Sequence, residues 1–313
     1  MNKIHPFDEF AYNVCTLLST SSLHKLKRVN DWGFIASFVH KKVVLLSCTI
    51  YIPEQSEVPF YVLSAPHGNS SIRAILDQNI SLSQHLHGRI IFLYFKPTSA
   101  LRNEDLPRRV RLDGPTYLQI LDRASINANY LHFEGVNLDL MNLERLKLCR
   151  LTEIYIKECL ALAPESRFLA WFKRQMKLAS FETVIILDTP SAEPLGLEDH
   201  LIDFLLSGPH LIFLTSKSSS ENPNLIHMSK GFLKKLAEAW LSHDHKGKRS
   251  SILTFDSPDW EMTNEGLVPE IFPDRMFHDG FGVHGHMVHR KQGSRWARVK
   301  AEKEFREISL EVD

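Results

Sequence analysis

Two aspartates directly follow short apolar strings that we predict to be strands. Asp188 comes after Val184–Leu187, and Asp256 comes after Ile252–Phe255. Many α/β enzymes place catalytic carboxylates at the carboxyl edge of their sheet. However, no base or nucleophile accompanies either aspartate in the sequence, and an aspartate after a strand commonly caps the next turn. We favour the cap, and keep as an alternative an α/β-fold enzyme that uses these strand-end carboxylates.

A glycine-rich stretch near the C-terminus could bind phosphate. Gly280–Gly285 matches the pattern GxGxxG, which binds dinucleotides when a buried strand precedes it and a helix follows it. The residues after Gly285 have the pattern of a strand. We therefore predict no helix there whose N-terminus could bind a phosphate. We therefore expect a turn leading into a hairpin, and no cofactor.

Histidines cluster in two places. On a strand, His284 and His286 would share one face, as two metal ligands could, but His289 falls on the opposite face. Residues 243–245 (His-Asp-His) come just after a predicted helix, where a cationic histidine suits the helix dipole. Since no cysteine lies near either cluster, we expect solvated histidines and no metal site. The sequence also lacks a nucleophile elbow, a P-loop and a zinc-protease motif, so we assign no catalytic residue.

Composition narrows the class of protein and its compartment. The 313 residues carry 37 Lys+Arg against 37 Asp+Glu, and the zero net charge removes the usual electrostatic argument for nucleic acid or an anionic membrane as partner. With 43% hydrophobic residues the chain can bury a real core. No apolar run approaches the roughly 18 residues of a membrane helix, and the N-terminus does not resemble a signal peptide. The four cysteines form no disulfide framework. We predict an intracellular protein, cytoplasmic or nuclear.

Residues 1–45 have the pattern of three short helices. Six apolar positions follow a helical period on one face: Phe7, Phe10, Ala11, Val14, Cys15 and Leu18. Ser21 or Ser22 can cap a second segment. Asp31 can cap a third, whose core face carries Trp32, Ile35, Ala36 and Val39. Together these segments predict a small helical module.

The remaining residues predict two further regions. Residues 46–108 form a β-rich connecting segment, and the strand candidates of this part of the chain are Val43–Ile52, Phe60–Leu63 and Ile90–Phe95. In residues 109–313, strands and helices alternate, which favours a mostly parallel sheet with crossover helices. The predicted strands are Tyr130–Phe133, Ile154–Ile156, Val184–Leu187, Leu211–Leu214 and Ile252–Phe255; the predicted helices are Pro115–Ser125, Leu140–Leu148, Ser166–Ala179, Leu197–Leu206 and Ser229–Leu241.

The spacing of these strands leaves two architectures open. The first three intervals between strand starts are 24, 30 and 27 residues, close to the length of a leucine-rich repeat. We do not find the LxxLxLxxN signature written out, so a degenerate α/β solenoid competes with an ordinary doubly wound sheet. At the C-terminus, Val283–Arg290 and Arg295–Lys300 flank a turn and predict a β-hairpin, and residues 308–312 alternate as a last strand.

Several stretches resemble one protein family. Residues 288–299 read VHRKQGSRWARV, with a basic pair, a polar residue and glycine in a turn, and residues 232–241 read FLKKLAEAWL. Together with the module from Phe7 to Trp32, they are similar to the large nematode family of F-box and F-box-associated proteins. The resemblance covers nearly the whole chain through short motifs.

The resemblance implies a fold and a function. The fold would be a short F-box-like helical module followed by a leucine-rich-repeat-like strand–helix domain with a C-terminal β-hairpin. The function would be that of a non-catalytic substrate receptor in an F-box-type cullin–RING ubiquitin ligase, with the module binding the ligase adaptor and the repeat domain a protein target. The apolar residues that we expect to contact the adaptor are Phe7, Phe10, Leu17, Leu18 and Trp32. A repeat scaffold with no link to a ligase remains a further alternative.

Overall fold

The chain divides into two compact units that are each built from helices and strands. The computed structural model describes residues 10–12, 14–15, 18, 20–53, 58–65, 88–141, 143–160, 165–189, 195–208, 210–216, 230–246, 250–254, 285–292, 295–302 and 307–312. The first unit comprises Met1–Leu131 and Arg145–Arg150, and the second comprises His132–Glu144 and Leu151–Asp313. The predicted mixed α/β class is confirmed. The boundaries that we expect after residues 45 and 108 lie within the first unit and stay predictions.

The N-terminal part of the first unit is helical. Residues 10–12 and 14–15 are helical, and α2 (Thr20–Leu26) and α3 (Asn30–Lys42) follow. Their buried core consists of Ala11, Cys15, Leu23, Ile35, Ala36 and Val39, as the helical period predicts for the first and third segments.

The predicted caps of these helices are wrong. Because α2 begins at Thr20, Ser21 and Ser22 lie inside it. The N-cap of α3 is Val29, which makes no side-chain cap bond, so Asp31 lies in the first turn. There its carboxylate still faces the positive end of the helix dipole.

Strands β1 to β4, two short 3-10 helices and helix α5 follow the helical module in the first unit. The strands β1 (Val44–Ile52), β2 (Phe60–Ser64), β3 (Gly88–Pro97) and β4 (Val110–Arg111) lie in the order β3-β1-β2-β4. Strand β1 pairs parallel with β3 and antiparallel with β2. Two short 3-10 helices, η2 (Thr98–Ala100) and η3 (Leu106–Arg108), lie between β3 and β4. Helix α5 (Gly114–Asn127) begins where the Asp113 carboxylate accepts the Thr116 N–H at 2.7 Å.

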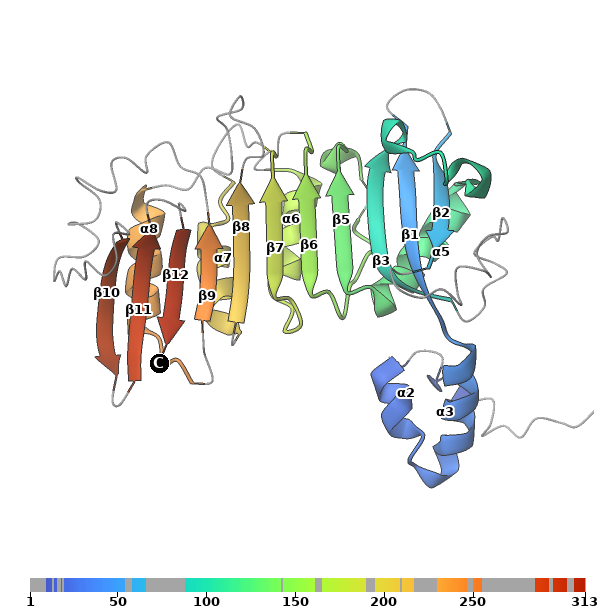
Figure 1. The fold of residues 1–313 in the computed structure, drawn as a ribbon, viewed down its shortest axis with the longest axis horizontal. Helices are drawn as coiled ribbons and strands as arrows, with labels where there is room; N and C mark the ends of the chain where they lie inside the picture. Colours follow the sequence, from blue (N-terminus) through green and yellow to red (C-terminus); the bar gives the residue numbers. More distant parts are fainter. Residues whose placement is uncertain are drawn as a thin grey trace, which may run out of the picture. The chain divides into compact units, whose positions relative to one another are not determined.

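The second unit contains the alternating strands and helices that the sequence predicts. After β5 (Tyr130–Glu134), which contributes residues 132–134, come β6 (Glu153–Lys157), β7 (Thr183–Leu187), β8 (His210–Ser216) and β9 (Ser250–Thr254). Strands β6 to β9 pair in parallel. Helices α6 (Arg167–Gln175), α7 (Glu198–Ser207) and α8 (Lys230–Ser242) connect successive strands and lie behind the sheet in Figure 1.

An antiparallel group of strands ends this unit. Strands β10 (Gly285–Gln292) and β11 (Arg295–Glu302) form the predicted hairpin, and β12 (Glu307–Val312) pairs with both β11 and β9. The order is therefore β5-β6-β7-β8-β9-β12-β11-β10. From β5 to β9 the spatial order follows the chain, whereas a doubly wound sheet reverses direction at a switch point.

The helix that we predict over residues 140–148 is wrong. Among the described residues between β5 and β6, the one helical element is the 3-10 turn η4 (Leu138–Leu140). The buried residues of this stretch are Leu138, Met141, Leu143, Leu146, Leu148 and Leu151. Their intervals alternate between three and two residues, which matches neither a helix nor a regular strand. The many leucines of this stretch therefore do not indicate a helix, because their spacing is not helical.

A recurring pattern of burial accompanies the strands. Buried residues recur at intervals of three, two and three residues in Ala128, Leu131, Phe133 and Val136, in Leu151, Ile154, Ile156 and Cys159, and in Phe181, Val184, Ile186 and Thr189. The middle set reads LxxIxIxxC, which has the spacing of the leucine-rich-repeat signature with isoleucine at two of its leucine positions. The literal signature LxxLxLxxN is not written out in this chain, but buried residues with its spacing occur at 151–159.

Candidate protein-interaction surfaces

The helical module exposes several large apolar side chains. In α3, Phe34 is 82% exposed and Phe38 is 43% exposed, and because they are four residues apart they share one side of the helix. Phe10 is 59% exposed and Val29 is 47% exposed. A module of this size has too small a core to bury every apolar residue that it carries. These four residues are called the module face below.

The residues predicted to contact the adaptor differ in their exposure. Phe10 is exposed, and its ring packs edge-on against that of Trp32 with the centroids 6.2 Å apart. Leu18 and Trp32 are half-buried against the core of the module. Phe7 and Leu17 lie outside the described residues.

Phe34 and Phe38 were missed at the sequence level. The signal was present, because α3 carries more apolar residues than one core stripe can hold. Each phenylalanine directly precedes a core residue, Ile35 or Val39, and so falls beside the stripe.

A buried arginine connects the helical module to β3 of the same unit. Arg89 is 4% exposed, and its guanidinium donates hydrogen bonds to the carbonyl oxygens of Leu18 and, at 3.2 Å, Cys15. Carbonyls at the end of a helix lack partners within the helix, so a cationic donor suits them. Burial, and then the nearby charge of Arg150, lowers the pKa of Arg89.

In the second unit, one face of the sheet is not covered by the crossover helices. Figure 1 shows α6, α7 and α8 behind the strands, and the buried residues of each strand alternate with half-buried ones that face the opposite way. We call these half-buried residues the open face: His132, Glu134, Glu153, Tyr155, Lys157, Thr183, Ile185, Leu187, Ile212 and Ile252. Its β5–β6 part is aromatic and charged, and its β7–β9 part is largely aliphatic.

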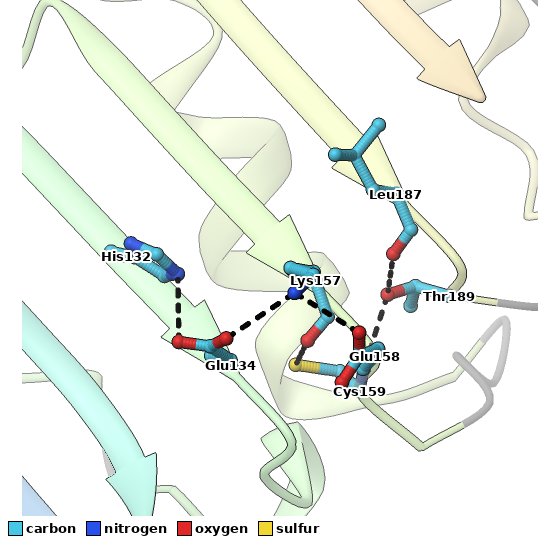
Figure 2. A network of polar contacts seen from close by, with 7 residues as sticks. All are labelled: His132, Glu134, Lys157, Glu158, Cys159, Leu187 and Thr189. Atoms are coloured by element: carbon cyan, nitrogen blue, oxygen red, sulfur yellow. Dashed lines mark hydrogen bonds and ion pairs between the residues drawn. The ribbon is translucent and has the colours of Figure 1, made fainter. Parts of the chain in front are cut away.

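A network of polar contacts lies at one end of the open face (Figure 2). The Lys157 ammonium lies 3.4 Å from a carboxylate oxygen of Glu134 and 3.0 Å from one of Glu158. Nε2 of His132 lies 3.7 Å from the other oxygen of Glu134, and its ring centroid is 4.6 Å from that of Tyr155. The bond to Glu158 is the main cause that raises the pKa of Lys157. Two carboxylates thus already neutralise this lysine.

The turns after β5, β6 and β7 share one backbone conformation. Gly135, Glu158 and Asp188 have φ values of 63°, 51° and 47°, in the left-handed region. The N–H of Gly135 donates to the Lys157 carbonyl at 2.9 Å, and the N–H of Glu158 donates to the Leu187 carbonyl at 3.0 Å. Asp188, which the enzyme alternative would use, is therefore part of a repeated structural turn. Asp256 lies outside the described residues.

A cavity of about 390 Å³ lies at the other end of β7 from Asp188. Its polar lining includes Lys177, Glu182, His200 and Asp203. Burial, followed by the charges of Lys173 and Lys177, lowers the pKa of His200. Asp188 does not line this cavity.

The remaining candidate motifs lie only partly within the described residues. Within the described residues, no group of three or more His, Cys, Asp or Glu side chains could hold a metal ion. His245 is 3% exposed, so our prediction of a solvated histidine at this position is wrong. Its ring donates a hydrogen bond to the carbonyl oxygen of Trp240, near the end of α8, at a distance of 2.5 Å. Residues 280–284 of the glycine-rich stretch lie outside the described residues. In the described part of the chain, no helix is both long and apolar enough to cross a membrane.

The described structure defines a mixed α/β protein with an apolar helical module and a parallel strand–helix region. Searches against protein-family profiles, curated proteins and solved structures find no match for this chain.

Proposed function

We propose that the chain is a non-catalytic substrate-receptor subunit of an F-box-type cullin–RING ubiquitin ligase. Its helical module would bind the ligase adaptor. The α/β part would be a degenerate leucine-rich-repeat-like domain that binds a protein target. The single observation that carries this proposal is the module face, because four large apolar side chains are exposed between residues 10 and 38. Several exposed apolar side chains on one small module are typical of a protein-binding surface.

Features of the second unit support the repeat-like domain. The strands β5 to β9 follow the chain order, the crossover helices lie on one side, and residues 151–159 read LxxIxIxxC, with the spacing of the leucine-rich-repeat signature. The repeated left-handed turns after β5, β6 and β7 fit the same interpretation. Stacked strand–turn units of this kind present an extended surface suited to protein binding.

The arrangement around Asp188 favours the receptor over an enzyme. Asp188 lies in a turn, and the cavity described above lies at the opposite end of its strand. An enzyme using this carboxylate would need a pocket and a partner base beside it.

The test is co-purification of the full chain with the F-box-binding adaptor. Phe34→Asp should abolish binding, because a charge replaces the most exposed apolar side chain of the module face. The matched control is Leu140→Asp, since Leu140 is 81% exposed and lies outside the module. Both variants should unfold at the temperature of the parent chain, because neither side chain belongs to the core.

The outcomes separate the alternatives. Binding that is lost only in Phe34→Asp supports the receptor. If the folded parent chain does not bind the adaptor, the ligase assignment is wrong and a repeat scaffold becomes the better explanation. If both variants bind the adaptor equally well, the adaptor contact lies outside the module face.

A further inference from the structure

Among the described residues, one carboxylate of the open face has no cationic partner. Glu153 lies on β6 and is half-buried, and no Lys, Arg or His among the described residues lies within ion-pair distance of its carboxylate. Burial is the only cause that acts on it, and it raises the pKa of Glu153. By contrast, Lys157 on the same strand has two glutamate partners. Negative charge is therefore in excess on this part of the face.

Apolar side chains lie directly beside Glu153. The strand register places Thr183 of β7 opposite Glu153 and Ile212 of β8 opposite Thr183. This row of side chains across the sheet therefore becomes aliphatic at β8. The next row along the strands places Tyr155 opposite Ile185. Neighbouring strands are about 5 Å apart, and alternate residues of a strand are about 7 Å apart. An acid, an aromatic ring and aliphatic side chains thus lie within reach of one short segment.

We infer that the open face binds an extended segment of the target protein in which a basic residue pairs with Glu153 and a nearby apolar residue packs on Ile185. This inference rests on the target-binding role in the proposed function and names the chemistry of the target. In an extended segment, side chains two residues apart face the same way at about 7 Å, which matches the spacing of the rows. The Tyr155 ring, two residues from Glu153, adds a surface on which a cation is favoured.

The charge of the face selects this partner over others. The carboxylates of Glu134, Glu153 and Glu158 outnumber the single ammonium of Lys157, so phosphate-bearing partners are repelled. A purely apolar segment would leave the Glu153 carboxylate desolvated without compensation, which is costly. A basic residue compensates for that desolvation.

The experiment selects binders from a displayed library of random peptides on the full chain and measures their affinities. Selected peptides should be enriched in a lysine or arginine close to an apolar residue. Glu153→Gln should weaken their binding by about ten-fold or more, the usual effect of losing a hydrogen bond to a charged group. Ile185→Ser should weaken it comparably and leave the preference for a basic residue intact.

A matched control and a second readout make the result decisive. Glu182→Gln removes an exposed glutamate that directly precedes β7 and lines the cavity, and should change affinity by less than about two-fold. Affinity should also fall as salt screens the ion pair. The inference is overturned if the selection gives no binders, if binders lack the basic residue, or if Glu153→Gln binds as tightly as the parent.

Failure of this inference can be told apart from failure of the proposed function. Glu153→Gln should co-purify with the adaptor as well as the parent chain does, since Glu153 lies outside the module. Selected basic peptides without adaptor binding would remove the ligase link and leave the open face as a target site. Adaptor binding by a chain that selects no such peptides would keep the ligase link and remove the open face as a target site.

Discussion

The backbone N–H of Cys159 donates a hydrogen bond to Oγ1 of Thr189 at 3.2 Å, between the turns that follow β6 and β7. The same hydroxyl donates to the Leu187 carbonyl at 3.0 Å. Thr189 is fully buried and Cys159 is 4% exposed, so water does not substitute for these bonds. One hydroxyl thus joins two successive turns that are 30 residues apart in the chain.

Thr189→Val should destabilise the second unit. Valine keeps the shape of threonine but leaves the buried N–H of Cys159 without an acceptor, which costs about 1–3 kcal/mol. Urea unfolding of the full chain measures this loss, and Thr189→Ser is the control because it retains the hydroxyl. A valine variant as stable as the parent would show that the bond contributes nothing.

The strands and crossover helices could be predicted because their apolar periods are local. The five strands predicted from Tyr130 to Phe255 correspond to β5 to β9, and four of the five predicted helices correspond to α5 to α8. The exception is the helix predicted over residues 140–148. Its buried residues recur at alternating intervals of three and two residues, which do not fit the period of a helix. That spacing is readable in the sequence once strand and turn are considered together.

The candidate sites could be predicted only in part. Phe10 was recognised as exposed apolar surface, but Phe34 and Phe38 require knowing which side of α3 meets the core. The contacts of Arg89 are made with residues 71 and 74 positions away, and no local pattern indicates them. Likewise, only the strand register shows that Thr183 and not a cation lies opposite Glu153.

Arg89→Met should loosen the N-terminal helix. Methionine fills similar apolar volume but donates no hydrogen bond, so the Leu18 carbonyl loses the Arg89 donor and the Cys15 carbonyl keeps only the Leu18 N–H, at 3.2 Å. We expect a cost of about 1–3 kcal/mol. Hydrogen exchange should quicken in residues 10–15 and stay unchanged in β6 and β7. Arg102→Met is the control, because the side chain of Arg102 is 68% exposed and its pair with Glu104 contributes little. Unchanged exchange in residues 10–15 would contradict this role of Arg89.

Gly33→Ala should destabilise the module, although alanine normally favours a helix over glycine by about 1 kcal/mol. A Cβ at position 33 would lie 2.6 Å from the Lys27 carbonyl oxygen, so the backbone of α3 or of the preceding turn must shift. Such overpacking costs about 1–3 kcal/mol. Hydrogen exchange in α2 and α3 measures the effect, and Ser37→Ala in the same helix should be neutral or stabilising. A stabilised Gly33→Ala variant would show that the backbone relaxes freely.

Glu153→Gln should stabilise the folded chain increasingly as the pH rises. Burial raises the pKa of Glu153 in the folded state, so its ionised form is disfavoured there relative to the unfolded chain. The stability that the protonated Glu153 side chain contributes is therefore fully present below the ordinary glutamate pKa of about 4.3. It is lost as the pH rises through the raised pKa of Glu153 in the folded state. Glutamine is neutral throughout and avoids this loss.

Urea unfolding of parent and variant at pH 4 and pH 7 measures the difference. The advantage of Glu153→Gln should be larger at pH 7, and Glu144→Gln, at an exposed loop position, controls for removing one negative charge. An advantage that is equal at both pH values would contradict the burial of an uncompensated carboxylate. A variant that gains stability while losing peptide affinity would show that Glu153 is retained for binding, because a residue needed only for the fold would lose both together.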